Sequence, residues 1–206
     1  MAVVLVPASR MERWVLNFNG RHGTTGLAVV DGALTGAASD GSRFAARLPF
    51  GETYAGLPDA AGFAAAAREL PADWGVLLVR KGGFAVARLA GERMGESKVG
   101  QRHVQGRTKA GGQSQQRFAR RRDNQARQAY EAAADHAARI LDGLDGPLVA
   151  GGDHVAVDEV LSDPRLRRLR PLEPWLPVPD PRRSVLEAAT ADAAAIRVDV
   201  VNADDR

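Results

Sequence analysis

The residues best suited to chemistry stand together in a glycine-rich loop, residues 106–113, which reads Gly-Arg-Thr-Lys-Ala-Gly-Gly-Gln. Glycines permit a positive φ and let the backbone approach a partner closely. The amide of Gln113 donates and accepts hydrogen bonds without carrying a charge. Beside RNA phosphates, where a carboxylate would be repelled, such an amide can position a water molecule. The loop is therefore a candidate site for hydrolysis next to a polyanion.

Positive charge is concentrated around this loop. The chain carries a net charge of only +3, but residues 98–127 hold nine Lys and Arg against a single acid, Asp123, and the rest of the chain is net acidic. A basic patch on an otherwise acidic protein is typical of nucleic-acid binding. The candidate RNA-binding residues are Arg107, Lys109, Arg117, Arg120, Arg121, Arg122 and Arg127.

A long helix is expected to follow the loop, with Ser114 as its N-cap. About 28 residues make it roughly 42 Å long, and Gly143 and Gly146 close it. Only its second half has an apolar stripe, formed by Ala126, Tyr130, Ala133, Ala137, Ile140, Leu141 and Leu144. The first half is mostly arginine and polar, so we expect it to project from the body of the protein.

The elements around the loop indicate an α/β fold with a mixed sheet flanked by helices. From residue 71 we expect strands at 74–79, 84–89 and 91–104, a strand at 148–150, a helix at 153–161 capped by Asp153, a strand at 176–178, a helix at 181–194 and a strand at 196–201. Gly82-Gly83 turns the first strand into the second. The third strand is more polar, which favours the edge of a sheet.

The first 70 residues predict a smaller element packed on this core. Ser9 and Glu12 fit a capping box for a helix that Gly20 ends. Short strands follow over 26–48, with hairpin turns at Asp31-Gly32 and Asp40-Gly41. A second helix is expected at 58–70. We therefore divide the chain into 1–70 and a catalytic domain at 71–206, unless the whole forms one continuous domain.

Several other chemistries lack support in the sequence. There is no cysteine, so disulfides and thiolate metal sites are excluded. His103 and His154 have no Ser or Cys partner at a recognisable spacing. Helix capping and a solvated helix face explain the carboxylates near His154. We expect no metal or cofactor. The N-terminus does not resemble a signal peptide, no apolar run is long enough to cross a membrane, and a cytoplasmic protein is expected.

The loop belongs to a longer string that resembles a known family. Gly111-Gly112-Gln113-Ser114 is followed by Arg117-Phe118-Ala119-Arg120 and then Arg122. This order closely resembles the middle domain of the class-1 peptide-release factors of eukaryotes and archaea, where the same pattern leads from a catalytic loop into a long helix. A looser resemblance extends over about residues 74–169. It implies a ribonuclease-H-like domain with a projecting Gly-Gly-Gln loop.

The chain departs from the stop-codon readers of that family. Only about 70 residues precede the strand meander, and they contain no Asn-Ile-Lys-Ser decoding motif. The layout is more similar to the Vms-like release factors (VLRF), particularly their compact actinobacterial branch. This resemblance implies a codon-independent peptidyl-tRNA hydrolase that acts in ribosome rescue on stalled ribosomes or split large subunits.

The resemblance also implies roles for individual residues and partners. Gly111, Gly112 and Gln113 would be catalytic, and the nearby arginines would hold rRNA or tRNA. The partners would be the large ribosomal subunit and peptidyl-tRNA, bound by a monomer without a membrane. Two alternatives stay open: a tRNA 3′-end endonuclease acting on peptidyl-tRNA, and an rRNA-binding module without catalysis.

Overall fold

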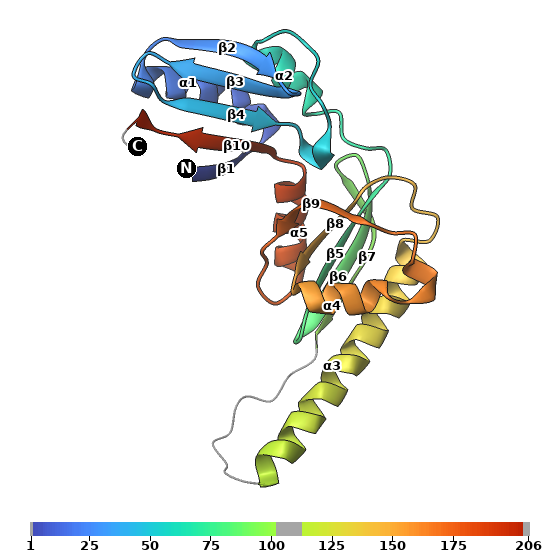
Figure 1. The fold of residues 1–206 in the computed structure, drawn as a ribbon. Helices are drawn as coiled ribbons and strands as arrows, with labels where there is room; N and C mark the ends of the chain where they lie inside the picture. The colour runs from blue at the N-terminus through green and yellow to red at the C-terminus, as the bar shows by residue number, and fades with distance from the viewer. Residues whose placement is uncertain (1, 102–112, 204–206) are drawn as a thin grey trace. The chain divides into compact units, whose positions relative to one another are not determined.

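The chain forms two compact units, residues 1–70 with 191–206 and residues 71–190, which are described separately below (Figure 1). The computed structural model describes the backbone of residues 2–101 and 113–203, and the side chains of these residues except 101 and 113–125. Each unit combines helices with a five-stranded sheet. The expected α/β class with flanking helices is therefore confirmed.

The first unit contains an antiparallel sheet in the order β1-β10-β4-β3-β2. Its strands are β1 (Ala2–Val6), β2 (Thr25–Val30), β3 (Ala33–Ala38), β4 (Arg43–Arg47) and β10 (Ile196–Val201). The hairpin turn expected between β2 and β3 is present, with positive φ at Asp31 (49°) and Gly32 (72°). The last strand of the chain thus lies inside the sheet of the N-terminal unit, between β1 and β4.

Two helices pack on one face of this sheet, α1 (Met11–His22) and α2 (Ala60–Ala66). The expected capping box is wrong: Ser9 lies in a 3-10 turn, and the α1 N-cap is Arg10, without a side-chain cap hydrogen bond. The helix also continues through Gly20 and ends at His22, with Gly23 as its C-cap at a φ of 87°. A glycine inside a helix costs only about 1 kcal/mol, so the packed face overrides it.

The second unit contains a mixed sheet in the order β7-β6-β5-β8-β9. Its strands are β5 (Trp74–Arg80), β6 (Gly83–Ala90), β7 (Arg93–Gln101), β8 (Leu148–Gly152) and β9 (Pro171–Leu176). The pairs β5–β8 and β8–β9 are parallel, and the others are antiparallel. The expected meander is confirmed, with β7 at the edge. The strand expected at 176–178 is wrong in its limits, because β9 begins at Pro171 and ends at Leu176.

Three helices accompany this sheet. They are α3 (Gln113–Ile140), α4 (His154–Leu161) and α5 (Arg183–Ala193), of which the last three residues belong to the first unit. Asp153 caps α4 as expected, since its carboxylate accepts a hydrogen bond from the backbone N–H of Val155 at 3.1 Å. The core of the unit lies where α3 and α4 pack on β5, β6 and β8. Among the described helices, none is long and apolar enough to cross a membrane.

Candidate functional site

The candidate hydrolytic and RNA-binding residues divide between the loop and α3. Gly111, Gly112, Arg107 and Lys109 lie outside the described residues. The others fall on one helix, in the order Gln113, Arg117, Arg120, Arg121, Arg122 and Arg127. Ser114, the expected N-cap, lies inside the first turn. The side chain of Arg127 is exposed.

The helix α3 combines a projecting half with a packed half. It has 28 residues, which corresponds to about 42 Å. In Figure 1 the half nearer its N-terminus, in yellow-green, extends beyond the sheet, and the half nearer its C-terminus lies against it. The first four N–H groups of any α-helix have no acceptor within the helix. The first N–H groups of α3, which begins at Gln113, therefore have no acceptor within the helix, and its N-terminus is the positive end of the helix dipole.

Small residues hold the packed half close to the sheet. Ala133 and Ala137 are completely buried, and Ile140 and Leu141 are nearly so. These residues confirm the apolar stripe expected from the sequence. The ring of His136 stacks on Phe84 of β6, with centroids 5.6 Å apart and planes at 28°. The base of the helix is thus fixed by close packing.

Arg88 clamps the C-terminal end of α3. Its Nε and Nη2 donate hydrogen bonds to the two carboxylate oxygens of Asp73, at 2.7 and 2.9 Å. Its Nη1 donates to the backbone carbonyl of Asp142 at 2.5 Å, and Nη2 also donates to that of Gly143 at 3.2 Å. Asp142 and Gly143 lie in the turn that follows α3, so the guanidinium group satisfies carbonyls of this turn and complements the negative end of the helix dipole.

The charges of this clamp stabilise one another. The hydrogen bonds from Arg88 lower the pKa of Asp73, and the backbone N–H of Asp145, which donates to the same carboxylate at 3.1 Å, acts in the same direction. Asp73 in turn raises the pKa of Arg88. The pair therefore stays ionised across the physiological pH range and ties β6, the loop before β5 and the end of α3 together.

Two further ion pairs brace the same helix. Arg165 donates to Asp135 of α3 and to Asp163, both at 2.7 Å. The hydrogen bonds from Arg165 lower the pKa of Asp163 to about 2. Arg139 of α3 pairs with Glu96 of β7. The projecting half of α3 therefore extends from a base held on three sides.

His154 lies in a structural contact and not in a catalytic cluster of described residues. His154 stacks on Trp175, with ring centroids 3.7 Å apart and planes at 17°. The indole Nε1 of Trp175 donates to the backbone carbonyl of Gly152 at 3.3 Å. His103 lies outside the described residues. In the part of the chain that the structure describes, no group of His, Asp and Glu has the arrangement of a metal site.

The clamp at the base of α3 is not among the features expected from the sequence. Arg88 interrupts an otherwise apolar strand, Phe84–Ala87 and Leu89, and a charged residue in a buried run indicates a specific partner. This charged residue is the signal that could have revealed the clamp. The sequence does not identify Asp73 as its partner, because the two residues are 15 positions apart on different elements.

Comparison with known proteins agrees with the motif. A family model described as Actinobacteria/chloroflexi VLRF1 release factor matches residues 72–199, a range that begins just before β5 and includes the Gly-Gly-Gln loop, all of α3 and most of β10. A search of curated proteins gave no match. The family match covers more than half of the 206 residues. It confirms the expected resemblance, and the chain belongs to the actinobacterial and chloroflexi VLRF1 family of release factors.

Proposed function

We propose that this protein is a codon-independent peptidyl-tRNA hydrolase that frees nascent chains from stalled ribosomes or split large subunits. The observation that carries the proposal is the string Gly111-Gly112-Gln113 placed directly before an arginine-bearing helix with an anchored base. Membership in a release-factor family supports it. In this proposal the partners are the large subunit and peptidyl-tRNA, and the protein acts in the cytoplasm as a monomer.

The proposed reaction is hydrolysis of the ester between the nascent peptide and the tRNA ribose. The oxygen of water attacks the ester carbonyl carbon, the bond from that carbon to the ribose oxygen breaks, and the ribose oxygen receives a proton. Gln113 orients the water through its amide, and its backbone N–H stabilises the developing oxyanion. The two glycines before it let the backbone enter a narrow rRNA site, where a side chain would add strain of about 1–3 kcal/mol.

The proposed role of α3 is to carry this loop to the ester. An anchored helix transmits the position of its base to its tip, which supports precise placement of a catalytic group. Arg117, Arg120 and Arg121 hold phosphates along the way, a role to which the planar guanidinium is suited. For the second unit we propose the ribonuclease-H-like architecture of release-factor middle domains, consistent with its antiparallel meander followed by a parallel strand.

The experiment that tests the proposal measures release from purified large subunits carrying a labelled peptidyl-tRNA. Gly112→Ala and Gln113→Ala are expected to lower the release rate by about 100-fold or more, the typical cost of losing one oxyanion donor or positioning group. Gln116→Ala, which changes a glutamine of the same helix, is the matched control and is expected to retain the wild-type rate. Ribosome binding, measured by co-sedimentation, should be unchanged in all three.

The released tRNA distinguishes the chemistry. Ester hydrolysis leaves an intact 3′ end, so the tRNA can be recharged by its synthetase. Release with a shortened tRNA that cannot be recharged would instead establish a tRNA 3′-end endonuclease. Ribosome binding without any release, unaffected by Gly112→Ala, would establish a non-catalytic rRNA-binding module.

The arginines of α3 are tested through binding. Arg120→Glu is expected to weaken ribosome binding, whereas Arg68→Glu, an exposed arginine of the first unit, is the charge-matched control. If about five phosphate contacts form, the logarithm of affinity should fall with the logarithm of salt concentration at a slope of roughly −3.5 to −4.5. In Arg120→Glu the slope of log affinity against log salt concentration should become shallower by the amount that corresponds to about one phosphate contact. In the control the slope should remain unchanged.

A further inference from the structure

The first strand of the chain is an unprotected sheet edge. β1 pairs with β10 on one side, and no described strand pairs with the other. All five of its residues are apolar, and Val3, Val4 and Leu5 are 50%, 39% and 39% exposed. The pairing with β10 runs without a bulge. Natural proteins usually block such an edge with charge, proline or a bulge, because unpaired N–H and C=O groups invite another strand.

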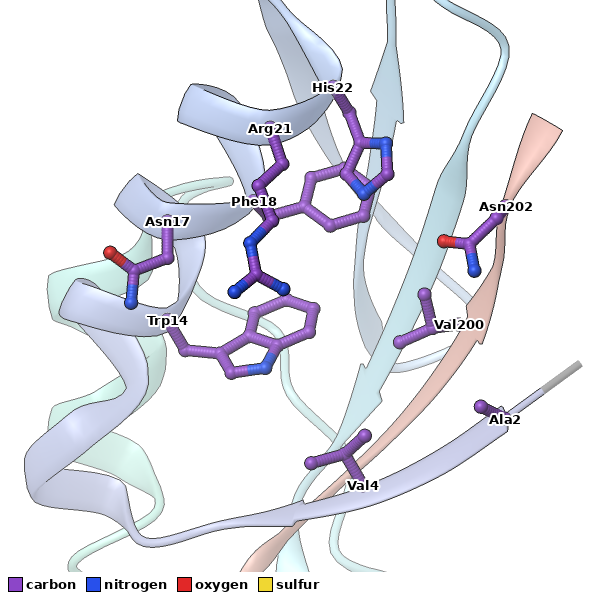
Figure 2. A pocket seen from close by; sticks show the side chains of 9 residues that line it. All are labelled: Ala2, Val4, Trp14, Asn17, Phe18, Arg21, His22, Val200 and Asn202. Carbon is purple, nitrogen blue, oxygen red and sulfur yellow. The ribbon is translucent and has the colours of Figure 1, made fainter. Parts of the chain in front are cut away.

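A groove runs beside this edge, between β1 and α1. It consists of two adjoining hollows of about 330 and 540 Å³, which share Val4, Trp14 and Asn17. Figure 2 shows the first hollow, where Trp14 and Arg21 of α1 lie opposite Val4 of β1 and Val200 of β10. The indole N–H of Trp14 has no hydrogen-bond acceptor among the described residues. The groove therefore offers aliphatic walls and an unused donor.

The rim of the groove is basic. Arg10, Arg13 and Arg21 line it and are exposed, and none forms an ion pair with a described residue. Glu12 is the one exposed carboxylate of α1 on this rim, against three arginines. Two acidic side chains of other elements are already engaged: Asp40 accepts from His22 at 2.9 Å, and Asp199 pairs with Arg47 and Arg197. Three guanidinium groups without an ion pair to a described residue, beside an apolar hollow, favour a negatively charged occupant.

We propose that β1 and this groove bind an extended, acidic peptide segment of a partner protein, which adds to the sheet as a further strand. Its backbone pairs with the free edge of β1, its aliphatic side chains pack on the exposed valines, and its carboxylates meet the arginines. A second copy of this chain fits less well, because edge-to-edge pairing would bring two rows of arginine to one groove. A nucleic acid would satisfy the arginines but has no strand backbone to pair with β1.

The site is independent of the Gly-Gly-Gln loop and is tested without ribosomes. The probe is a fluorescein-labelled octapeptide of four Val-Glu repeats, which places valines on one face of a strand and glutamates on the other. Four Val-Lys repeats form the charge-reversed control. Binding to the full chain is measured by fluorescence anisotropy, and the site is located from amide shifts and hydrogen exchange in ¹⁵N-labelled protein.

The expected result is binding of the acidic probe alone, with slower exchange of β1 amides. The double variant Arg10→Glu/Arg13→Glu should weaken it about tenfold or more, whereas the matched double variant Arg43→Glu/Arg68→Glu should bind as the wild type does. Absence of binding, or equal binding of both probes, would overturn the proposal. Displacement of the acidic probe from β1 by an eight-residue oligouridine would instead assign the groove to RNA. A dimer of this chain that a substitution in β1 abolishes would assign the groove to a second copy.

Discussion

Two edge strands of this protein, β7 in the sheet of the second unit and β1 in that of the first, have opposite character. β7 carries Arg93, Glu96 and Lys98, and its register with β6 shifts between Ala87 and Leu89. Glu96 also pairs with Arg139 of α3. β1 has no charge, no shift and no described partner on its outer side. One edge is thus protected against pairing and used to brace the helix that carries the candidate site, whereas the other is left able to pair.

The inner strands of the two sheets also differ, in how completely their side chains are buried. In β5 the six residues before Arg80 are all buried, so this strand is covered on both faces. In β10 buried and half-buried residues alternate, which is the pattern of a sheet with one covered face. The second unit is therefore built around a fully enclosed strand that supports α3, and the first unit keeps apolar strand surface accessible.

The largest expected effect is the difference in stability loss when a leucine is truncated to alanine in each of the two units. Leu77→Ala, in the enclosed strand β5, should lower the free energy of unfolding by about 3 kcal/mol, because it leaves a cavity at a fully buried site. Leu5→Ala, in the open edge, should cost less than about 1 kcal/mol, because the side chain already contacts water. Urea unfolding followed by circular dichroism measures both. Equal losses would remove the distinction between the two units.

The clamp at the base of α3 should give the next largest effect. Asp73→Asn removes the charge from a part-buried, bidentate pair with Arg88, and we expect a loss of about 1–2 kcal/mol after allowance for partial solvent screening. Asp192→Asn, on an exposed carboxyl group, is the matched control. If the two variants unfold alike in urea, the clamp does not stabilise the second unit.

The same carboxylate predicts an acid-dependent loss of stability. The folded-state pKa of Asp73 lies below its ordinary value of 3.8, so its contribution is fully present above that value. It is lost as pH falls from about 3.8 through the folded pKa, because the unfolded chain then binds the proton more readily. The free energy of unfolding of the wild type minus that of Asp73→Asn, measured by urea titration, should be smaller at pH 2.5 than at pH 6. A difference that stays constant would contradict this assignment.

Exchanging the character of the edges should change association more than stability. Val3→Glu gives β1 a negative charge like that of Glu96 in β7, and stability should change by no more than about 0.5 kcal/mol because Val3 is half exposed. Binding of the Val-Glu probe should still fall, because the added carboxylate repels the acidic probe. Glu96→Val, which removes a charge from β7, should increase self-association in sedimentation. Unchanged sedimentation would show that Glu96 does not protect β7.

The smallest expected effect concerns the exposed pair of Glu96 and Arg139. Both side chains are more than half exposed, so Arg139→Gln should change stability by at most about 0.5 kcal/mol, and any change should vanish at high salt. Thermal unfolding at low and at 1 M salt measures this. A salt-independent loss would mean that Arg139 contributes through packing of its aliphatic stem rather than through its charge.

The sequence predicts the local features of this fold well. The turn at Asp31-Gly32, the Asp153 cap and the apolar stripe of α3 follow from short-range rules that depend on a few neighbouring residues. Helix limits are predicted less accurately: α1 passes Gly20, because its buried face outweighs one unfavourable residue, and it ends only at His22, with Gly23 as its C-cap. Local propensity is weak where tertiary packing acts on the same residues.

Long-range pairings could not be predicted in this way. Arg88 and Asp73, or Arg165 and Asp135, lie on different elements and leave no periodic pattern in the sequence. The same holds for the groove beside β1, which depends on where α1 crosses the sheet. The candidate hydrolytic loop was found because its motif is continuous in the sequence, whereas the residues that hold α3 in place are not.

The position of β10 has a consequence for how the chain is made. In the described sheet β10 is the only neighbour of β1 and joins it to β4, yet it follows the whole of the second unit in the chain. During synthesis β1 therefore cannot pair with β10 until about 190 further residues have been added to the chain. The unit carrying the candidate release loop can fold first, because domains generally fold as units in the order of their emergence. A chain whose translation stops before Ile196 would leave the apolar strand Ala2–Val6 without that neighbour, so a factor proposed to rescue incomplete proteins has a fold that is itself sensitive to incompleteness.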